Sequence, residues 1–178
     1  KGHCAPGLYS ALALKGFFPF EDLKTLRHIG SYLQGHPNMN TVAGVDMSTG
    51  SLGQGISAAA GMAEGAKYLN KDINVYTLLG DGEIEEGQVW EAMMFASQYK
   101  LDNLCVIVDV NGLQIDGKCE DVMNAEPIDK KMEAFGLEVV KINGNDFDEL
   151  EKAFEKFHEN KGSGKPFGII MKTVKGLG

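Results

Sequence analysis

Two residues of this sequence offer hard oxygen donors at places where a buried run of the chain ends. Asp81 stands between two glycines directly after the apolar run 74–79, and Asn111 follows a second apolar run, 104–110. Proteins hold Mg²⁺ with carboxylate and carbonyl oxygens, usually together with phosphate oxygens of a bound molecule. If the two runs are neighbouring strands, the sequence predicts a cation site that also receives a phosphate.

A simpler interpretation treats both stretches as turns, because Gly-Asp-Gly and Asn-Gly are common turn sequences. The spacing favours the ion site. Asp81 and Asn111 are 30 positions apart (111 − 81), about the length of one strand–helix–strand unit. Ligands of parallel sheets bind beyond the carboxyl ends of the strands. Gly82 would let a phosphate approach the backbone, and the N–H groups that begin the next helix would point at it.

The elements that must position these residues alternate along the chain. Apolar spacing predicts strands over 74–79, 104–110, 137–142 and 167–174, and helices over about 5–15, 21–29, 51–69, 85–99, 129–135 and 146–160. This alternation predicts an α/β fold, a three-layer parallel sheet with helices on both faces. Residues 30–50 are rich in Gly, Pro, Asn and Thr and indicate a long loop with a functional role.

Two of the predicted helices carry a distinctive pattern. The helix 51–69 is rich in alanine and glycine, and small side chains allow close backbone approach, so we expect it to be buried or to lie at an interface. The helix 146–160 places four large apolar residues on one face. These residues are Phe147, Leu150, Phe154 and Phe157.

Length and composition limit the function. The 178 residues suit a single domain, 1–178, and the first and last residues look like a sequence truncated at both ends. The net charge of −8 argues against a broad basic surface for nucleic acid. No apolar run reaches 18 residues, so we expect no membrane-spanning segment. The three cysteines show no CxxC spacing, which favours a reducing cytoplasm over a disulfide framework.

Several motifs together resemble the amino-terminal, diphosphate-binding half of transketolases, within the thiamine diphosphate enzymes. "GDGEIEEG" (80–87) followed by "VDVNGLQIDG" (108–117) is similar to the superfamily's diphosphate-binding motif. Three further stretches are similar to transketolases in particular: "KGHCAPGLY" (1–9), "GHPN" (35–38) and "STGSLGQGI" (48–56). The resemblance covers essentially the whole chain and implies thiamine diphosphate as cofactor.

The resemblance assigns residues to the metal and the cofactor. Asp81, the side chain of Asn111 and the backbone carbonyl of Leu113 would hold Mg²⁺ or Ca²⁺. Backbone N–H groups of Gly82 and Glu83 would face the diphosphate. Other cofactor contacts would come from Gly50, Ser51, Leu52, Asn111 and Ile115. Plain core packing is the competing interpretation of Leu52 and Ile115.

The resemblance also implies catalytic residues. His3 would lie near the cofactor diphosphate, and His36 would contact donor hydroxyls or assist proton transfer, which suits an imidazole near neutral pH. Glu86 would link two active sites at a dimer interface. The alternative interpretation of Glu86 is an acid in the first turn of a helix. This is the only interpretation that we give Glu85. We read His28 as a helix-end residue and His158 as a solvated one.

The implied reaction transfers a two-carbon ketol unit from a ketose phosphate to an aldose phosphate, as in the pentose phosphate pathway. The implied partners are a carboxy-terminal subunit with the pyrimidine-binding domain and a second copy of this half. One alternative is another thiamine diphosphate enzyme, such as 1-deoxyxylulose-5-phosphate synthase or a 2-oxo acid dehydrogenase. A non-catalytic diphosphate-binding module is the other.

Overall fold

The computed structural model describes residues 1–115 and 117–177, in two compact units, Lys1–Gly55 and Ile56–Gly178. Within the described residues, no helix is long and apolar enough to cross a membrane. The expectation of a single domain, 1–178, stays a prediction.

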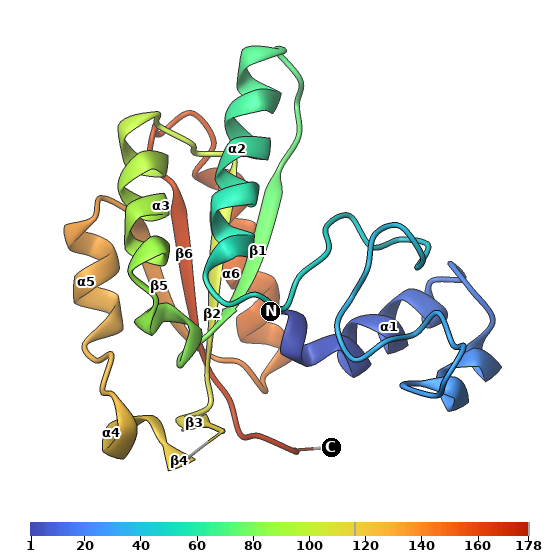
Figure 1. Ribbon diagram of the computed structural model, residues 1–178. Helices are drawn as coiled ribbons and strands as arrows, with labels where there is room; N and C mark the ends of the chain where they lie inside the picture. Colours follow the sequence, from blue (N-terminus) through green and yellow to red (C-terminus); the bar gives the residue numbers. More distant parts are fainter. Residues whose placement is uncertain (116, 178) are drawn as a thin grey trace. The chain divides into compact units, whose positions relative to one another are not determined.

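The second unit is built on a parallel sheet of four strands in the order β1-β2-β6-β5 (Figure 1). Its strands are β1 (Val75–Gly80), β2 (Leu104–Val110), β5 (Glu138–Asn143) and β6 (Phe167–Lys172). All four were predicted to within about two residues. The predicted neighbours β1 and β2 do pair, with Leu79 opposite Val108. Their carboxyl ends therefore lie at the same edge of the sheet.

Helices cover both faces of this sheet, as predicted (Figure 1). α2 (Gln54–Tyr68), α3 (Gly87–Gln98) and α5 (Ile128–Ala134) contribute to one buried cluster, and α6 (Phe147–Glu159) packs in another. Strand β2 divides its side chains between them: Val106 and Val108 join the first cluster, and Cys105 and Ile107 join the second. An almost continuous apolar strand such as "LCVIVDV" suits this position because both of its faces are buried.

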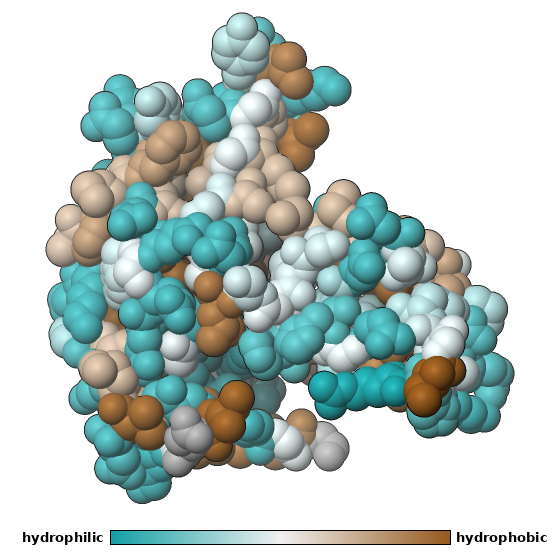
Figure 2. Space-filling view, in the orientation of Figure 1, coloured by the Kyte–Doolittle hydropathy of each residue, from teal (hydrophilic) through white to brown (hydrophobic). Residues whose placement is uncertain are grey.

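The flanking helices follow their sequence patterns with one exception. Asp146 caps α6, because its side chain accepts hydrogen bonds from the N–H groups of Asp148 (2.9 Å) and Glu149 (3.2 Å). Phe157 is buried and Phe154 is half-buried, but Phe147 is 86% exposed. Phe147, the first residue of the helix, therefore lies outside the buried part of this face. Some small residues of α2 are buried and others are exposed. Figure 2 shows a pale surface along this helix.

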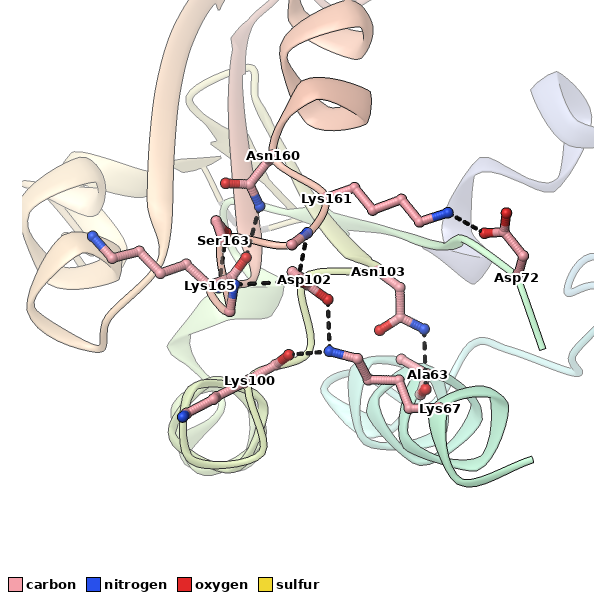
Figure 3. Close-up of polar contacts among 12 residues, drawn as sticks. Ala63, Lys67, Asp72, Lys100, Asp102, Asn103, Asn160, Lys161, Ser163 and Lys165 are labelled. Atoms are coloured by element: carbon pink, nitrogen blue, oxygen red, sulfur yellow. Dashed lines mark hydrogen bonds and ion pairs between the residues drawn. The ribbon is translucent and has the colours of Figure 1, made fainter. Parts of the chain in front are cut away.

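A polar network joins α2 to three loops at the amino ends of the strands (Figure 3). The Lys67 ammonium of α2 donates to the Asp102 carboxylate (2.6 Å), whose other oxygen accepts from the N–H groups of Gly162 (2.9 Å) and Gly164 (3.1 Å). The Asn103 amide donates to the carbonyls of Ala63 in α2 (3.0 Å) and Ile73 (3.1 Å). Sequence analysis did not predict this network.

Small elements follow the carboxyl ends of β1 and β2. The 3-10 turn η3 (Glu83–Glu85) precedes α3, so the helix predicted over 85–99 begins at Gly87 instead. After β2 comes a hairpin of two short strands, β3 (Leu113–Gln114) and β4 (Gly117–Lys118), and then the helical turn α4 (Cys119–Val122). The hairpin and α4 were not predicted.

The first unit contains η1 (Gly2–Cys4), α1 (Ala5–Leu14), η2 (Phe20–Thr25) and a long loop. Tyr9 and Leu12 of α1 pack on Leu33, Val42 and Val45 of the loop, which gives this unit its own core. The predicted helix 5–15 and the loop 30–50 are confirmed. The helix predicted over 21–29 is a short 3-10 turn instead, since Arg27 adopts a left-handed conformation (φ 63°) that an α-helix excludes.

Candidate functional site

Asp81 lies directly beyond β1 and is 4% exposed. Its N–H donates to the carbonyl of Asp109 in β2 (3.1 Å), which continues the pairing of the two strands past Gly80. One carboxylate oxygen accepts the N–H of Gly82 (3.0 Å) and the other accepts the N–H of Gly112 (2.6 Å). The second of these bonds ties the loop after β1 to the loop after β2.

Asn111 follows the last residue of β2, as predicted. Its Oδ1 accepts the N–H of Leu113 (3.0 Å), and its Nδ2 donates to Asp109 Oδ2 (3.4 Å). Gly112, between Asn111 and Leu113, has a φ of +72°, a conformation that favours glycine. Asn111 thus forms a turn, while its carbonyl oxygen keeps a second lone pair that could ligate a cation. The turn interpretation and the metal interpretation are compatible.

The donors at these two strand ends suit a hard divalent cation. They are the carboxylate of Asp81, the amide oxygen of Asn111 and the backbone carbonyl of Leu113, all oxygen ligands. None of the ion pairs within residues 1–115 and 117–177 includes Asp81, although its carboxylate is buried. The same ranges hold no group of three or more His, Cys, Asp and Glu side chains that could bind a metal. A set with a single carboxylate fits an ion that also takes ligands from a phosphate.

The glutamates after Asp81 have different environments. Glu83 is buried, and its Oε2 accepts the N–H of Gly80 (3.2 Å). Glu85 accepts a hydrogen bond from the amide of Gln114 (3.0 Å), so it is more than the helix-start acid we expected. Glu86 is exposed in this chain and occupies the N-cap position of α3 without a side-chain capping bond. Its role at an interface stays a prediction.

In the first unit, the structure brings together His3, His36 and Gly50, which lie far apart in the sequence. The two imidazole rings are 4.9 Å apart between centroids and nearly perpendicular, at 87°. A Cβ added to Gly50 would lie 2.4 Å from Cδ2 of His36, and one added to Gly2 would lie 2.4 Å from the backbone nitrogen of Gly50. Glycines at both positions allow this approach, and the histidines keep exposed side chains.

The remaining predicted cofactor contacts are at the surface. Ser51 and Leu52 are exposed in the first unit, and Ile115 is 92% exposed in the second. Core packing therefore does not explain Leu52 or Ile115. His28 and His158 are exposed as well, and His158 lies in the last turn of α6.

Sequence reasoning did not identify two side chains beside the strand-end donors. Gln114 bonds to Glu85, and Cys119 is buried next to Asp81. Burial, and then the neighbouring carboxylate of Asp81, raises the pKa of the Cys119 thiol to about 11. This thiol is therefore protonated at neutral pH and can donate to Asp81. Neither residue has a sequence signal, since both contacts depend on the unpredicted hairpin.

Comparisons with known proteins agree on one family. The family model described as "Transketolase, thiamine diphosphate binding domain" matches residues 1–178. The 6-deoxy-6-sulfo-D-fructose transketolase subunit of Clostridium sp. (strain MSTE9) is 47% identical over 178 residues, which are 100% of this chain and 64% of that protein. Human transketolase is 46% identical over 179 residues, covering 100% of this chain and 28% of the relative.

Solved structures give the same result. The transketolase of Campylobacter jejuni has a TM-score of 0.86 at 40% identity, covering 96% of this chain and 28% of its own. The Leishmania mexicana transketolase has a TM-score of 0.87 at 32% identity, covering 96% and 27%. The chain thus spans less than two thirds of the length of these relatives.

Proposed function

We propose that this chain, which belongs to the transketolase thiamine diphosphate binding domain family, is the diphosphate- and metal-binding half of a transketolase. The reaction would move a two-carbon ketol unit from a ketose phosphate to an aldose phosphate. The observation that carries the proposal is the 2.6 Å hydrogen bond from Gly112 to Asp81, which holds the donors of two strand ends together. The match of the family over all 178 residues supports it.

The cation would be Mg²⁺ or Ca²⁺, held by Asp81, Asn111 and the carbonyl of Leu113, with diphosphate oxygens completing the shell. Among residues 1–115 and 117–177, the buried carboxylate of Asp81 has only N–H and thiol partners. A divalent ion would balance its charge. Gly82 and Glu83 would lie beside the diphosphate, and Gly50, Ser51, Leu52 and Ile115 beside the rings.

The bound cofactor supplies the carbanion chemistry that breaks and forms carbon–carbon bonds. The chain's own residues would bind the cofactor and orient the substrate. His3 and His36 present two imidazoles from one rigid contact, so His36 could move a proton at a sugar hydroxyl while His3 faces the diphosphate. Gly50 lets the His36 ring pack directly on the backbone, which fixes its direction.

We further propose a partner subunit that carries the pyrimidine-binding domain. Relatives named as subunits support this arrangement. One of them is a subunit of the apulose-4-phosphate transketolase from Actinobacillus succinogenes, 44% identical over 178 residues and with 63% of its length covered. Two copies of this half would meet near α2 and Glu86 and share the sites. Three free cysteines suit the cytoplasm, where the pentose phosphate pathway would use the enzyme.

Reconstitution tests the proposal. The purified chain should show no two-carbon transfer alone and should gain it when mixed with thiamine diphosphate, Mg²⁺ and a partner that carries the pyrimidine-binding domain. Glu86→Gln should weaken the assembly, measured by sedimentation, whereas Glu91→Gln on the exposed face of α3 should not. Transfer by the monomeric chain alone would rule out the partner, and no transfer with the partner would rule out the activity.

A further inference from the structure

The side chain of Gln114 bridges the two loops that carry the predicted metal ligands. Gln114 follows Leu113 in β3, and its Nε2 donates to Oε1 of Glu85 in η3 (3.0 Å). The contact therefore joins the hairpin after β2 to the turn after β1. It lies one residue from the Leu113 carbonyl and four residues from Asp81.

The stem of Gln114 also lies over Gly82. A Cβ added to Gly82 would be 3.2 Å from the Gln114 Cβ, tighter than an ordinary van der Waals contact. Gly82 has φ −70° and ψ −29°, which any residue adopts. The glycine thus leaves space for Gln114 rather than supplying backbone freedom, because an added Cβ would require the Gln114 stem to shift by a few tenths of an ångström.

The helical turn α4, which directly follows the hairpin, is attached to the same place. The N–H of Cys119 donates to the carbonyl of Gly112 (2.9 Å), while the N–H of Gly112 donates to Asp81. The Cys119 thiol also faces the Asp81 carboxylate. These bonds and the contacts of Gln114 together restrain the loop 111–113 at both of its ends.

We propose that Gln114 is a positioning residue for the metal site: its amide on Glu85 and its stem on Gly82 hold the Leu113 carbonyl at the distance from Asp81 that one cation requires. This inference rests on the proposed function. Mg²⁺ demands near-ideal octahedral geometry, so a loop that moves freely would lose affinity. Groups that hold ligands in place commonly contribute 10- to 100-fold in metal affinity.

Gln114→Met tests this directly, since methionine keeps the stem and removes the donor. The probe is Mn²⁺. Its binding to the full chain is measured by electron paramagnetic resonance with thiamine diphosphate present. We expect affinity to fall about tenfold. Ser97→Ala is the matched control, because it removes one side-chain hydrogen bond in the same unit, to the carbonyl of Phe135, and should leave Mn²⁺ binding unchanged.

The variants separate a failure of this inference from a failure of the proposed function. If Asp81→Ala loses Mn²⁺ and Gln114→Met binds it like wild type, the positioning role is wrong and the metal site stands. If Asp81→Ala also binds Mn²⁺ like wild type, both are wrong.

A double-mutant cycle checks that the contact with Glu85 is responsible. Glu85→Met and Gln114→Met should each weaken Mn²⁺ binding, and the double variant should bind no more weakly than the worse single variant. Losses that multiply would mean that the two side chains act independently, which contradicts the proposed bridge.

Discussion

The two ends of strand β2 carry the same pair of residue types in opposite circumstances. Asp102 and Asn103 precede the strand, and Asn111 follows it at the sheet edge where Asp81 lies directly beyond the neighbouring strand β1. Both aspartates are buried, at 8% and 4% exposed. At the amino end the chain provides the cation, the ammonium of Lys67 at 2.6 Å. At the carboxyl end, the part of the chain that the structure describes provides Asp81 with only N–H groups and a thiol.

The difference separates an acid whose charge is paired within the fold from one that we propose binds a cation. Burial alone would raise the pKa of Asp102, but hydrogen bonds from Lys67, Gly164 and Gly162 lower it below its ordinary value. Its charge is thus balanced within the fold (Figure 3). The charge of Asp81 is not balanced by any ion pair in the described ranges, so a divalent ion would be stabilised there. Residue type and burial alone do not distinguish the two aspartates.

The largest expected effect is that of Asp81→Ala on metal-dependent binding of thiamine diphosphate. We expect affinity to fall by more than about 100-fold, because a direct ligand should contribute at least as much as the outer groups that support one. The fold should survive, since the side chain lies beyond β1. Calorimetric titration measures the affinity, with Asp102→Asn as the control. Unchanged affinity in Asp81→Ala would show that Asp81, like Asp102, does not bind the metal.

Asn111→Leu should weaken the same binding by about 10- to 100-fold. The substitution removes an oxygen ligand and places an apolar group against a cation. Asn103→Leu at the opposite end should cost stability and leave cofactor affinity intact. If Asn111 served the turn alone, thermal unfolding would shift while titration gave the wild-type affinity.

Asp102→Asn should lower the free energy of unfolding by about 2 kcal/mol, because it leaves the Lys67 ammonium without its carboxylate and weakens the bonds from Gly162 and Gly164. Metal affinity should not change. Urea unfolding measures the first quantity and Mn²⁺ titration the second. A loss of metal affinity without a loss of stability would reverse the roles that we assign to the two ends.

The smallest effect concerns acid stability. Because the pKa of Asp102 is lowered in the folded state from an ordinary value of 3.8, its contribution is complete above that pH and is lost as the pH falls below it. The difference in melting temperature between wild type and Asp102→Asn should therefore shrink below about pH 4. A difference that stays constant down to about pH 2 would show that the charge of Asp102 contributes nothing.

The placement of Asp81 and Asn111 at the carboxyl ends of two paired strands could be predicted because it depends on local sequence patterns. Apolar runs locate β1 and β2, and Asp81 and Asn111 follow them directly. The amino-end network depends instead on a contact between Lys67 and Asp102, 35 positions apart, and no local pattern reports such a pairing.

The hairpin of β3 and β4 was missed for a related reason. Its strands have two residues each, which is too short for alternation of apolar and polar residues to be visible. Gln114 and Cys119 belong to or follow this hairpin, so their contacts could not be foreseen. The left-handed Arg27 that ends η2 is similarly invisible in the apolar spacing that predicted a helix over 21–29.

The central position of β2 also sets how fast different parts of the site open. Its residues 104–108 are buried, and the strand pairs with β1 on one side and β6 on the other. Amide hydrogens in such a strand exchange with solvent only when the whole unit unfolds, whereas those of an exposed loop exchange through local opening. Gly112 and Leu113 are exposed, so the loop should exchange far faster than the strand that carries it. A bound cation would slow the exchange of the loop amides selectively.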